Sequence, residues 1–329
     1  MQYYDDVYGL SMVPGGLLHD LVRSEAVRRL RNVSQAGASS FVRAGRNNNR
    51  YEHSLGVMTL TRLLGGNEVE QAAGLLQDLS HTAFSHTIDY VFDDRGEEFH
   101  ERIFQYVIER SDVPEILERH GLDWGTLFTK DNLLRVDVSA PLLCADRIDY
   151  TLRDLVRLGD IAAGQARAFV RQLTFRDNMV VSRDVEMAVN FVAWYAHLVR
   201  DVFMNPLELF VHDAFAKLIR RALETKVLTE SDLLSTDDAV LAKLLVDETY
   251  GLDVSLAEIR RMRKVVVGDF PHGVRVYSKG RKVDPPVLVG TQILPLSVVR
   301  PECGTVWESI ERVASEGIIV SALESRSAR

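Results

Sequence analysis

Cysteine is scarce in this chain, and so are segments that would attach it to a membrane. Only Cys144 and Cys303 occur among 329 residues, far apart in the sequence, which argues against a disulfide framework and against a cysteine-type zinc site. No apolar run approaches the roughly 18 residues that a membrane span needs. Met1 is followed by neither a basic segment nor the apolar core of a secretory signal. We therefore expect a cytoplasmic protein without a membrane partner.

An excess of positive charge is also missing. The 39 basic and 47 acidic residues give a formal net charge of −8 and a pI near 5.6. This balance argues against nucleic acid as a partner, because binding to a phosphate backbone depends on lysine and arginine. We find no internal repeat and no low-complexity segment. The hydrophobic and charged fractions, 46% and 26%, are typical of a globular protein with a sizeable core.

Helical periodicity dominates the first two thirds of the chain. In residues 17–33 the apolar positions recur at helical spacing, while the arginines fall mainly on other positions. An Asp-Asn pair between β-prone residues predicts a hairpin over residues 174–182. Further helices are predicted over residues 51–64, 68–79, 86–92, 97–110, 113–120, 140–158, 162–172, 184–203 and 207–226.

The pattern changes after residue 228. Two shorter helices, predicted over residues 237–250 and 255–262, precede β-prone runs that prolines and glycines separate. We therefore predict a mainly α protein of two parts. These are a helical core over residues 1–228 and a small α+β subdomain over residues 229–329.

Three polar side chains interrupt apolar helical runs. Asp78 and Asp146 each follow such a run directly, and His53 lies in a third helical segment. A carboxylate in this setting is costly unless a cation or hydrogen bonds compensate it. Two carboxylates and an imidazole suit a hard or borderline divalent ion such as Mg²⁺ or Mn²⁺, which would polarise a phosphoryl oxygen and activate water. Separate buried ion pairs with nearby arginines are the alternative.

Histidines follow the first of these carboxylates, Asp78. His86 and Asp89 are three residues apart on a predicted helix and share a face, so the carboxylate can orient the imidazole or raise its basicity. Either His81 or His86 would protonate a leaving-group oxygen, and the other would bind a phosphate. His100 is a further candidate, with an exposed helical histidine as the alternative.

Polar residues also share one stripe of the helix predicted over residues 140–158. They are Asp146, Asp149, Tyr150, Arg153 and Asp154, at offsets i, i+3, i+4, i+7 and i+8. We predict that this stripe is the wall of a polar cleft, and a solvated helix face is the alternative. The glycine- and asparagine-rich loop over residues 34–49, with the helix start after it, carries Arg43, Arg46 and Arg50 toward the same site, where they can bind phosphate.

Together these motifs resemble those of the HD-domain phosphohydrolases, in particular the deoxynucleoside triphosphate triphosphohydrolase branch. The resemblance spans roughly residues 15–225. It rests on Gln35-Ala36-Gly37, NRYEHSLGV at residues 49–57, LL-x-DL-x-H-x-x-FSH-x-x-D at residues 75–89 and DRIDYTLRD at residues 146–154. It implies an HD-domain helical fold, release of nucleoside and inorganic triphosphate, and assembly into dimers or larger oligomers.

The resemblance also implies roles by position. The metal ligands would be His53, Asp78 and Asp146, with Gln77 at the position of the family's namesake histidine. Phosphate contacts and proton transfer would fall to Arg50, His81, His86, Asp89 and His100. Contacts with the triphosphate or the sugar would fall to Arg147, Tyr150 and Asp154, and Gln35 matches a residue that contacts the sugar 3′-hydroxyl.

Two departures from the family pattern bear on these roles. Gln77 offers an amide oxygen, a neutral and weaker donor than imidazole for transition metals. The site should therefore bind metal more weakly, prefer harder ions or lack metal, and Mg, Mn, Fe, Co and Ni all stay candidates. Ala36 replaces a larger apolar residue near the sugar 2′ position, which leaves discrimination against ribonucleotides open.

We therefore predict a metal-dependent enzyme that hydrolyses nucleotides, with deoxynucleoside triphosphates as the first choice and another nucleotide or sugar phosphate next. The alternative is an HD-domain protein that binds nucleotide as a sensor or assembly partner, its turnover weakened or lost through Gln77. The presence of His81 and His86 favours the enzyme, because a sensor needs phosphate contacts but no proton-transfer groups.

Overall fold

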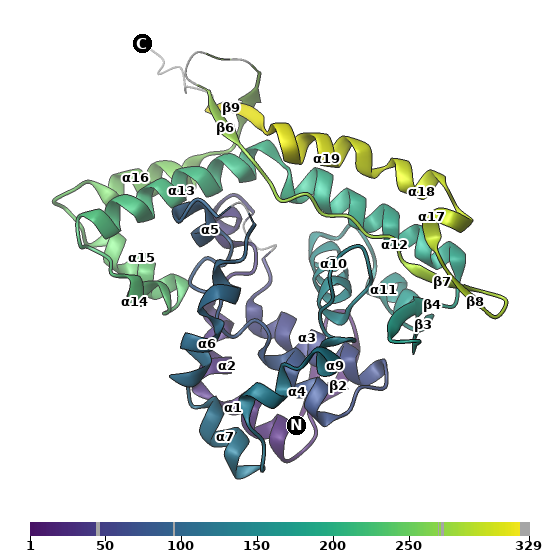
Figure 1. Ribbon diagram of the computed structural model, residues 1–329. Coiled ribbons are helices and arrows are strands. Elements are labelled where there is room, and N and C mark those ends of the chain that lie inside the picture. The colour runs from purple at the N-terminus through teal and green to yellow at the C-terminus, as the bar shows by residue number, and fades with distance from the viewer. Residues whose placement is uncertain (44–46, 95, 269, 271–272, 323–329) are drawn as a thin grey trace.

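Helices make up most of the structure (Figure 1). This computed structural model describes residues 1–43, 47–94, 96–268, 270 and 273–322, so the predicted phosphate-binding residue Arg46 lies outside the described residues. Three small sheets accompany the helices in this part of the chain, and the predicted mainly α fold class is confirmed. None of the described helices is long and apolar enough to cross a membrane.

The N-terminal region combines a β-hairpin with short helices. Its elements are β1 (Gln2–Asp5), β2 (Gly9–Met12), α1 (Leu17–Arg23), α2 (Glu25–Arg29), η1 (Leu30–Asn32) and η2 (Gly37–Phe41). The single helix predicted over residues 17–33 is wrong, because Ser24 divides it. The Ser24 hydroxyl accepts from the backbone N–H of Val27 and caps α2, so the backbone leaves the helical conformation at that residue.

The predicted metal ligands lie on or directly after three helices: α3 (Arg50–Leu63), α4 (Glu68–Leu76) and α10 (Ala145–Leu158). Helix α3 packs against both of the others. Asn49 caps α3, and Asn67 forms a capping box with Glu70 at the start of α4. Helix α10 begins later than predicted, after Cys144, whose backbone is extended. Gly56 lets α3 approach α10 closely, since a Cβ atom there would lie 2.0 Å from Asp149 Oδ1.

Among the remaining elements up to residue 224, two short helices over residues 124–127 and 130–133 lie where no helix was predicted, and the others agree with the predicted helices apart from their ends. The remaining elements are α5 (Thr87–Val91), α6 (Phe99–Glu109), α7 (Val113–Arg119), α8 (Trp124–Leu127), α9 (Lys130–Leu133), α11 (Ala163–Val170), α12 (Val185–His197), the π-helix η3 (Leu198–Phe203) and α13 (Pro206–Glu224). The predicted hairpin is confirmed as β3 (Leu173–Arg176) and β4 (Met179–Ser182). Its two turn residues, Asp177 and Asn178, both have positive φ, as this tight turn requires.

After residue 228 the chain mixes helices and strands, as predicted. Its elements are α14 (Glu230–Leu233), α15 (Asp237–Leu245), α16 (Leu252–Arg261), β5 (Val265–Val267), β6 (Val274–Val276), β7 (Pro286–Val289), β8 (Gln292–Pro295), α17 (Leu296–Val299), α18 (Glu302–Thr305), α19 (Trp307–Glu316) and β9 (Ile318–Ala322). Strands β5, β9 and β6 form one sheet, which contacts α13. Strands β7 and β8 extend the β3–β4 hairpin through a parallel β4–β7 pair. The domain boundary at residue 228 stays a prediction.

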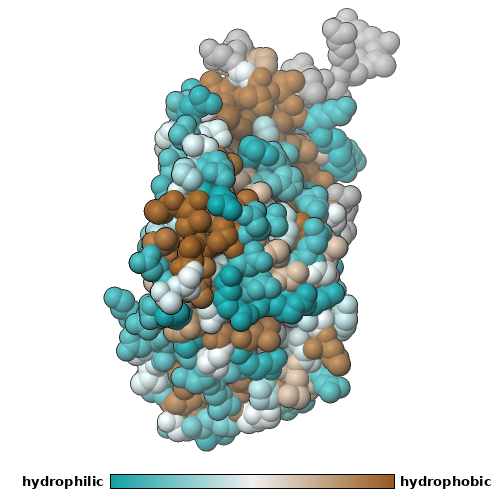
Figure 2. Space-filling model, turned by 90° about the vertical axis from the view of Figure 1, so that its right-hand side faces the viewer, coloured by the Kyte–Doolittle hydropathy of each residue, from teal (hydrophilic) through white to brown (hydrophobic). Residues whose placement is uncertain are grey.

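Two large hydrophobic clusters hold these elements together. One joins the N-terminal region to α3, α4, α10 and α12 and also contains Trp307 and Ile310 of α19. The other joins α5 to α13, α15 and α16. On the face that Figure 2 shows, the exposed hydrophobic residues form separate patches between hydrophilic ones. The candidate site opens between the two clusters. Its lining includes Phe104 and Tyr195, which pack in the first cluster, and His212 on α13, a helix of the second cluster.

Candidate functional site

Side chains from three helical segments meet around the imidazole of His53. Its Nε2 atom lies 3.0 Å from Asp146 Oδ1 and 3.3 Å from Asp78 Oδ2. The His53 ring is almost fully buried on α3, Asp78 follows the end of α4, and Asp146 belongs to the first turn of α10. Nε2 carries at most one proton, yet two carboxylate oxygens approach it. This arrangement fits a divalent cation between the three groups.

Gln77 joins the same group through its amide. Its Nε2 donates to Asp146 Oδ1 at 2.8 Å. In this orientation the amide nitrogen, and not the oxygen, faces the carboxylate, so Gln77 holds Asp146 in place. A half-turn of the amide would instead present its oxygen, the atom that binds hard cations.

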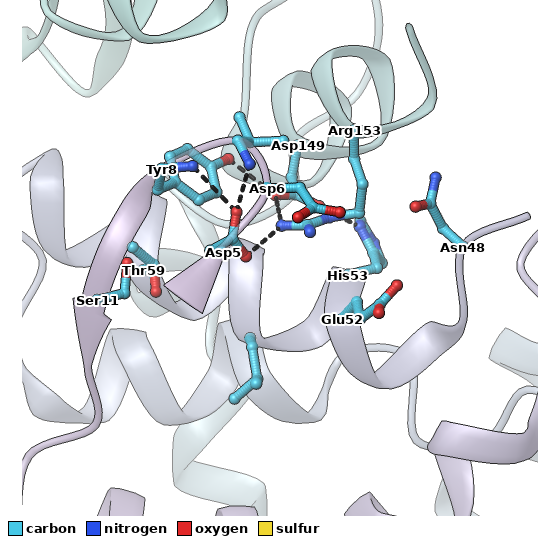
Figure 3. A network of polar contacts seen from close by, with 12 residues as sticks. Asp5, Asp6, Tyr8, Ser11, Asn48, Glu52, His53, Thr59, Asp149 and Arg153 are labelled. Carbon is cyan, nitrogen blue, oxygen red and sulfur yellow. Dashed lines mark hydrogen bonds and ion pairs between the residues drawn. The ribbon is translucent and has the colours of Figure 1, made fainter. Parts of the chain in front are cut away.

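A buried network stands behind His53 (Figure 3). Its Nδ1 atom lies 2.8 Å from Asp149 Oδ2, and the Asp149 side chain has no exposed surface. Asp149 also accepts from Tyr8 Oη and from the Arg153 guanidinium, which in turn donates to Asp5. Burial alone would lower the pKa of His53, but the hydrogen bonds to Asp146 and Asp149 raise it to about 10. The network fixes the orientation of the ring and directs Nε2 at the other two groups.

This network corrects the predicted polar stripe of α10. Asp146, Tyr150 and Asp154 do line the cleft, but Asp149 and Arg153 point away from it and are buried. The offsets i and i+3 differ by about 60° around a helix, enough to turn Asp149 from the cleft into the contact with α3. Sequence reasoning placed Asp149 on the helix but missed its contact with His53.

Three imidazoles form a second cluster beside Asp78. The ring centroids of His81 and His100 are 4.0 Å apart and stacked, and His86 lies edge-on to both. His86 Nδ1 lies 2.9 Å from Asp89 Oδ2, so the predicted contact between these two residues is present. His81 Nε2 lies 3.4 Å from Asp78 Oδ1. The Nδ1 atom of His100 is buried and has no hydrogen-bond partner among the described residues.

The protein environment keeps this cluster neutral. Burial and the charge of Arg50 hold the pKa of His81 well below its usual range. Burial lowers the pKa of His86 to about 3 although Glu97 opposes the shift, and the charges of Arg50 and Arg281 lower it further. Burial raises the pKa of Asp89 to about 6. Each imidazole is therefore uncharged, and it can donate one hydrogen bond through one ring nitrogen and accept one through the other.

Local backbone conformation sets the positions of these histidines. Phe84 and Ser85, between His81 and His86, both have positive φ, an uncommon conformation for residues with side chains. Gly37 allows this turn to lie against η2, since a Cβ atom there would be 2.5 Å from the carbonyl oxygen of Phe84. The side chain of Ser85 bonds Arg50 and the carbonyl oxygen of Ser34, which ties the turn to the N-terminal region.

Arg50 lies between the carboxylates around His53 and the cluster of three imidazoles. Its Nη1 lies 2.6 Å from Asp78 Oδ2, and both side chains are buried. Burial would raise the pKa of Asp78, but Arg50, His81 and His53 hold it well below its usual range. These neighbours favour the ionised form of Asp78, which can bind a cation.

The other predicted residues line one cleft with a volume of about 1290 Å³. Gln35 lies there with a buried Oε1 that has no hydrogen-bond partner in the described structure, and Asp154 accepts from Asn48. Tyr150 Oη lies 2.8 Å from Tyr195 Oη. Arg147 lines the cleft too, but its guanidinium donates to the carbonyl oxygens of Val138 and Leu142.

Asp137 is a cleft residue that sequence reasoning missed. Although the residue is exposed, the reduced solvation of its carboxyl group and the neighbouring Asp146 raise its pKa to about 7. Donor atoms of Asp137, Cys144 and Asp146 lie within 4.8 Å of one another, as do those of Asp78, His81 and His100. Asp137 lies in an irregular loop after α9, where no periodicity could signal it.

Comparison with known proteins gives relatives along the whole chain. The sequence is 36% identical over 325 residues to the uncharacterized protein YdhJ of Bacillus subtilis, covering 98% of this chain and all of that protein. It is 30% identical over 313 residues to the metal-dependent phosphohydrolase cns2 of Cordyceps militaris, covering 92% of this chain and 89% of cns2. Human deoxynucleoside triphosphate triphosphohydrolase SAMHD1 is 31% identical over 129 residues, which is 32% of this chain and 21% of SAMHD1. No family model matches the sequence.

Among solved structures, a phosphohydrolase of Bacteroides thetaiotaomicron superimposes on this fold with a TM-score of 0.77. The superposition covers 98% of this chain and 99% of that one, at 18% sequence identity. The mainly α fold predicted from the sequence is therefore confirmed, and this phosphohydrolase shares it.

Proposed function

Because the chain belongs to the family of metal-dependent phosphohydrolases that includes cns2, we propose that it is an HD-domain enzyme that hydrolyses phosphoesters of nucleotides. Deoxynucleoside triphosphates are the first choice of substrate, which the similarity of 129 residues to SAMHD1 supports. The observation that carries the proposal is the convergence of His53, Asp78 and Asp146 at the edge of a cleft that also holds three neutral imidazoles.

The residues around Nε2 of His53 would hold the divalent ion. His53, Asp78 and Asp146 provide one imidazole and two carboxylates, and Gln77 would contribute its amide oxygen after a half-turn. When bound, the ion polarises a phosphoryl oxygen and supplies activated water at neutral pH. The donor set, with two carboxylates and no thiolate, favours the harder divalent ions.

The other side chains would act on the substrate directly. Arg50 is fixed by Asp78 and Ser85 with its charge at the edge of the cleft, where it would stabilise charge on phosphate oxygens. The negative charge of a bound phosphate would raise the pKa of His86, and the protonated ring, oriented by Asp89, would then give its proton to the oxygen that leaves the phosphorus. Gln35 would accept a hydrogen bond from a sugar hydroxyl through its otherwise unpartnered Oε1.

The experiment combines metal analysis of the purified protein with a screen for release of phosphate and triphosphate. Nucleotides are supplied with Mg²⁺, Mn²⁺, Fe²⁺, Co²⁺ or Ni²⁺ in turn. We expect turnover that Asp146→Asn abolishes and that the matched variant Asp131→Asn retains, because Asp131 is exposed on α9 outside the cleft. Equal activity in Asp146→Asn and the wild type would overturn the proposal.

A nucleotide sensor is the second candidate, and the hydrogen bond from Gln77 to Asp146 favours it. An amide nitrogen on a ligand oxygen stabilises the carboxylate without any cation. Nucleotide binding without turnover under every metal would assign the protein to this class.

A further inference from the structure

A segment far from the predicted motifs closes one side of the cleft. Residues 277–283, which we name the strap, connect β6 to β7 and run along α19 in Figure 1. Ser278, Lys279, Gly280 and Arg281 of the strap all line the cleft. The family resemblance ends near residue 225, so it implies no role for this segment.

The strap is held at both ends. At its start, Tyr90 Oη on α5 donates to the carbonyl oxygen of Tyr277 at 3.0 Å. Directly after it, the backbone N–H of Asp284 donates to the carbonyl oxygen of Pro141 at 2.9 Å, in the loop that leads to Asp146. Val283 is buried, and a Cβ atom on Gly280 would lie 3.2 Å from Ala314 of α19. The strap therefore bridges the histidine side and the carboxylate side of the site.

The strap contributes two cationic residues, Lys279 and Arg281, to the lining of the cleft. Arg281 forms an ion pair with Glu97, and its guanidinium lies over the ring of Phe203 at 5.1 Å from the centroid. Lys279 forms no ion pair with any described residue. The neighbouring Lys282 instead pairs with Glu311 on α19 at 2.8 Å and does not line the cleft.

The arginines of the core are already occupied. Arg50 is bound to Asp78, Arg147 donates to backbone carbonyl oxygens, and Arg43 pairs with Glu208. A nucleotide with a chain of phosphates carries more negative charge than Arg50 alone can balance. Lysine and arginine bind phosphate oxygens through charge-assisted hydrogen bonds, and the strap offers one of each.

We propose that Lys279 and Arg281 bind the outer phosphate groups of the substrate, so that the strap selects nucleotides with a polyphosphate chain. Arg281 exchanges Glu97 for phosphate oxygens when the substrate enters, and Lys279 adds a contact of its own. The inference rests on the proposed function, because it assumes that the nucleotide occupies this cleft.

Steady-state kinetics with a deoxynucleoside triphosphate tests the proposal. We expect Lys279→Ala and Arg281→Ala each to raise KM by about tenfold or more while kcat changes much less, since they lose contacts remote from the reacting bond. Arg281→Lys should recover part of the loss. Lys282→Ala, the matched control, should keep the wild-type KM. An unchanged KM in both alanine variants, or an equal rise in the control, would overturn the proposal.

Binding of inorganic tripolyphosphate, measured by calorimetry, separates this inference from the proposed function. If the wild type turns over no nucleotide, weaker tripolyphosphate binding in Lys279→Ala than in Lys282→Ala still supports the strap as a polyphosphate site. Equal binding in these two variants, or no binding to the wild type, contradicts it. Lys279 forms no ion pair among the described residues and acts on Glu101 only through its charge, so its variant tests the proposal even if Arg281→Ala does not fold.

Discussion

The Nδ1 atom of His53 lies 2.8 Å from the carboxylate of Asp149, which is fully buried and also bound by Arg153. A metal-binding histidine oriented by a second carboxylate holds its ring and its proton in one arrangement. The pair connects the candidate metal site to the hydrogen bonds of the N-terminal hairpin.

Replacing Asp149 by asparagine should weaken both metal binding and folding. The amide cannot accept from His53 and Arg153 as the carboxylate does, and it leaves the Arg153 charge buried with only Asp5 as partner. We expect a 10- to 100-fold loss of metal affinity, of the order seen when such supporting carboxylates are removed. Calorimetric titration with Mn²⁺ measures it. Tyr8→Phe, which removes one hydrogen bond to the same carboxylate, should change the affinity far less.

Restoring a histidine at position 77 should strengthen metal binding. Gln77→His places an imidazole beside Asp78 and Asp146 and removes the amide that now bonds Asp146. We expect tighter binding of Mn²⁺, Co²⁺ and Ni²⁺, with the largest gain for Ni²⁺, because imidazole favours the later transition metals. Gln105→His on the exposed face of α6 is the control. Identical affinities in the two variants would show that position 77 does not contact the ion.

Gly56→Ala should destabilise the protein strongly. The added methyl would overlap Asp149 Oδ1 at 2.0 Å and Arg153 Nη2 at 2.2 Å, so α3 and α10 would have to separate. We expect a loss of about 2–4 kcal/mol in the free energy of unfolding, typical of overpacking that also disturbs a buried ion pair. Gly164→Ala on α11 has open space around its Cβ position and should gain up to about 1 kcal/mol. Urea denaturation compares the two.

Stability should fall in acid partly because of His212. Its ring nitrogens contact the hydroxyls of Ser39 and Thr87 at 2.9 and 2.8 Å, and burial, helped by the charge of Arg43, lowers its pKa to about 4. An unfolded histidine titrates near 6.5, so the unfolded chain takes up the proton first as the pH falls. The contribution of His212 is unchanged above pH 6.5 and is lost between pH 6.5 and 4.

His212→Gln tests this pH dependence. The wild type should lose at most about 3 kcal/mol more than the variant between pH 7.5 and pH 4, and less than that because the ring faces the cleft. Denaturant unfolding at both pH values gives the difference. Parallel losses in the two proteins would show that folding does not shift the pKa of His212.

The sequence predicted the helical fold and grouped the residues of the site because local patterns encode both. A carboxylate after an apolar helical run indicates a polar site, and the structure brings Asp78 and Asp146 to His53. The break at Ser24 was also encoded locally, since its hydroxyl caps α2, but the periodicity of residues 17–33 concealed it.

Contacts between distant segments could not be predicted in the same way. Nothing in the composition of residues 1–8 indicates that Asp5 and Tyr8 support Asp149, and nothing in the β-prone runs after residue 264 places Arg281 in the cleft. Helical offsets correctly placed Asp146, Tyr150 and Asp154 together on α10, but that Asp149 and Arg153 face away from the cleft depends on how α3 and α10 pack. The roles given to the site residues therefore stay predictions for the experiments above.

The network in Figure 3 also has a consequence for biosynthesis. Tyr8 and Asp149 are 141 residues apart, so a chain leaving the ribosome exposes its N-terminal hairpin and His53 long before the partner carboxylate has been translated. Until then, His53 has neither its orienting acid nor the α10 ligand, and the growing polypeptide cannot hold a cation there in its final geometry.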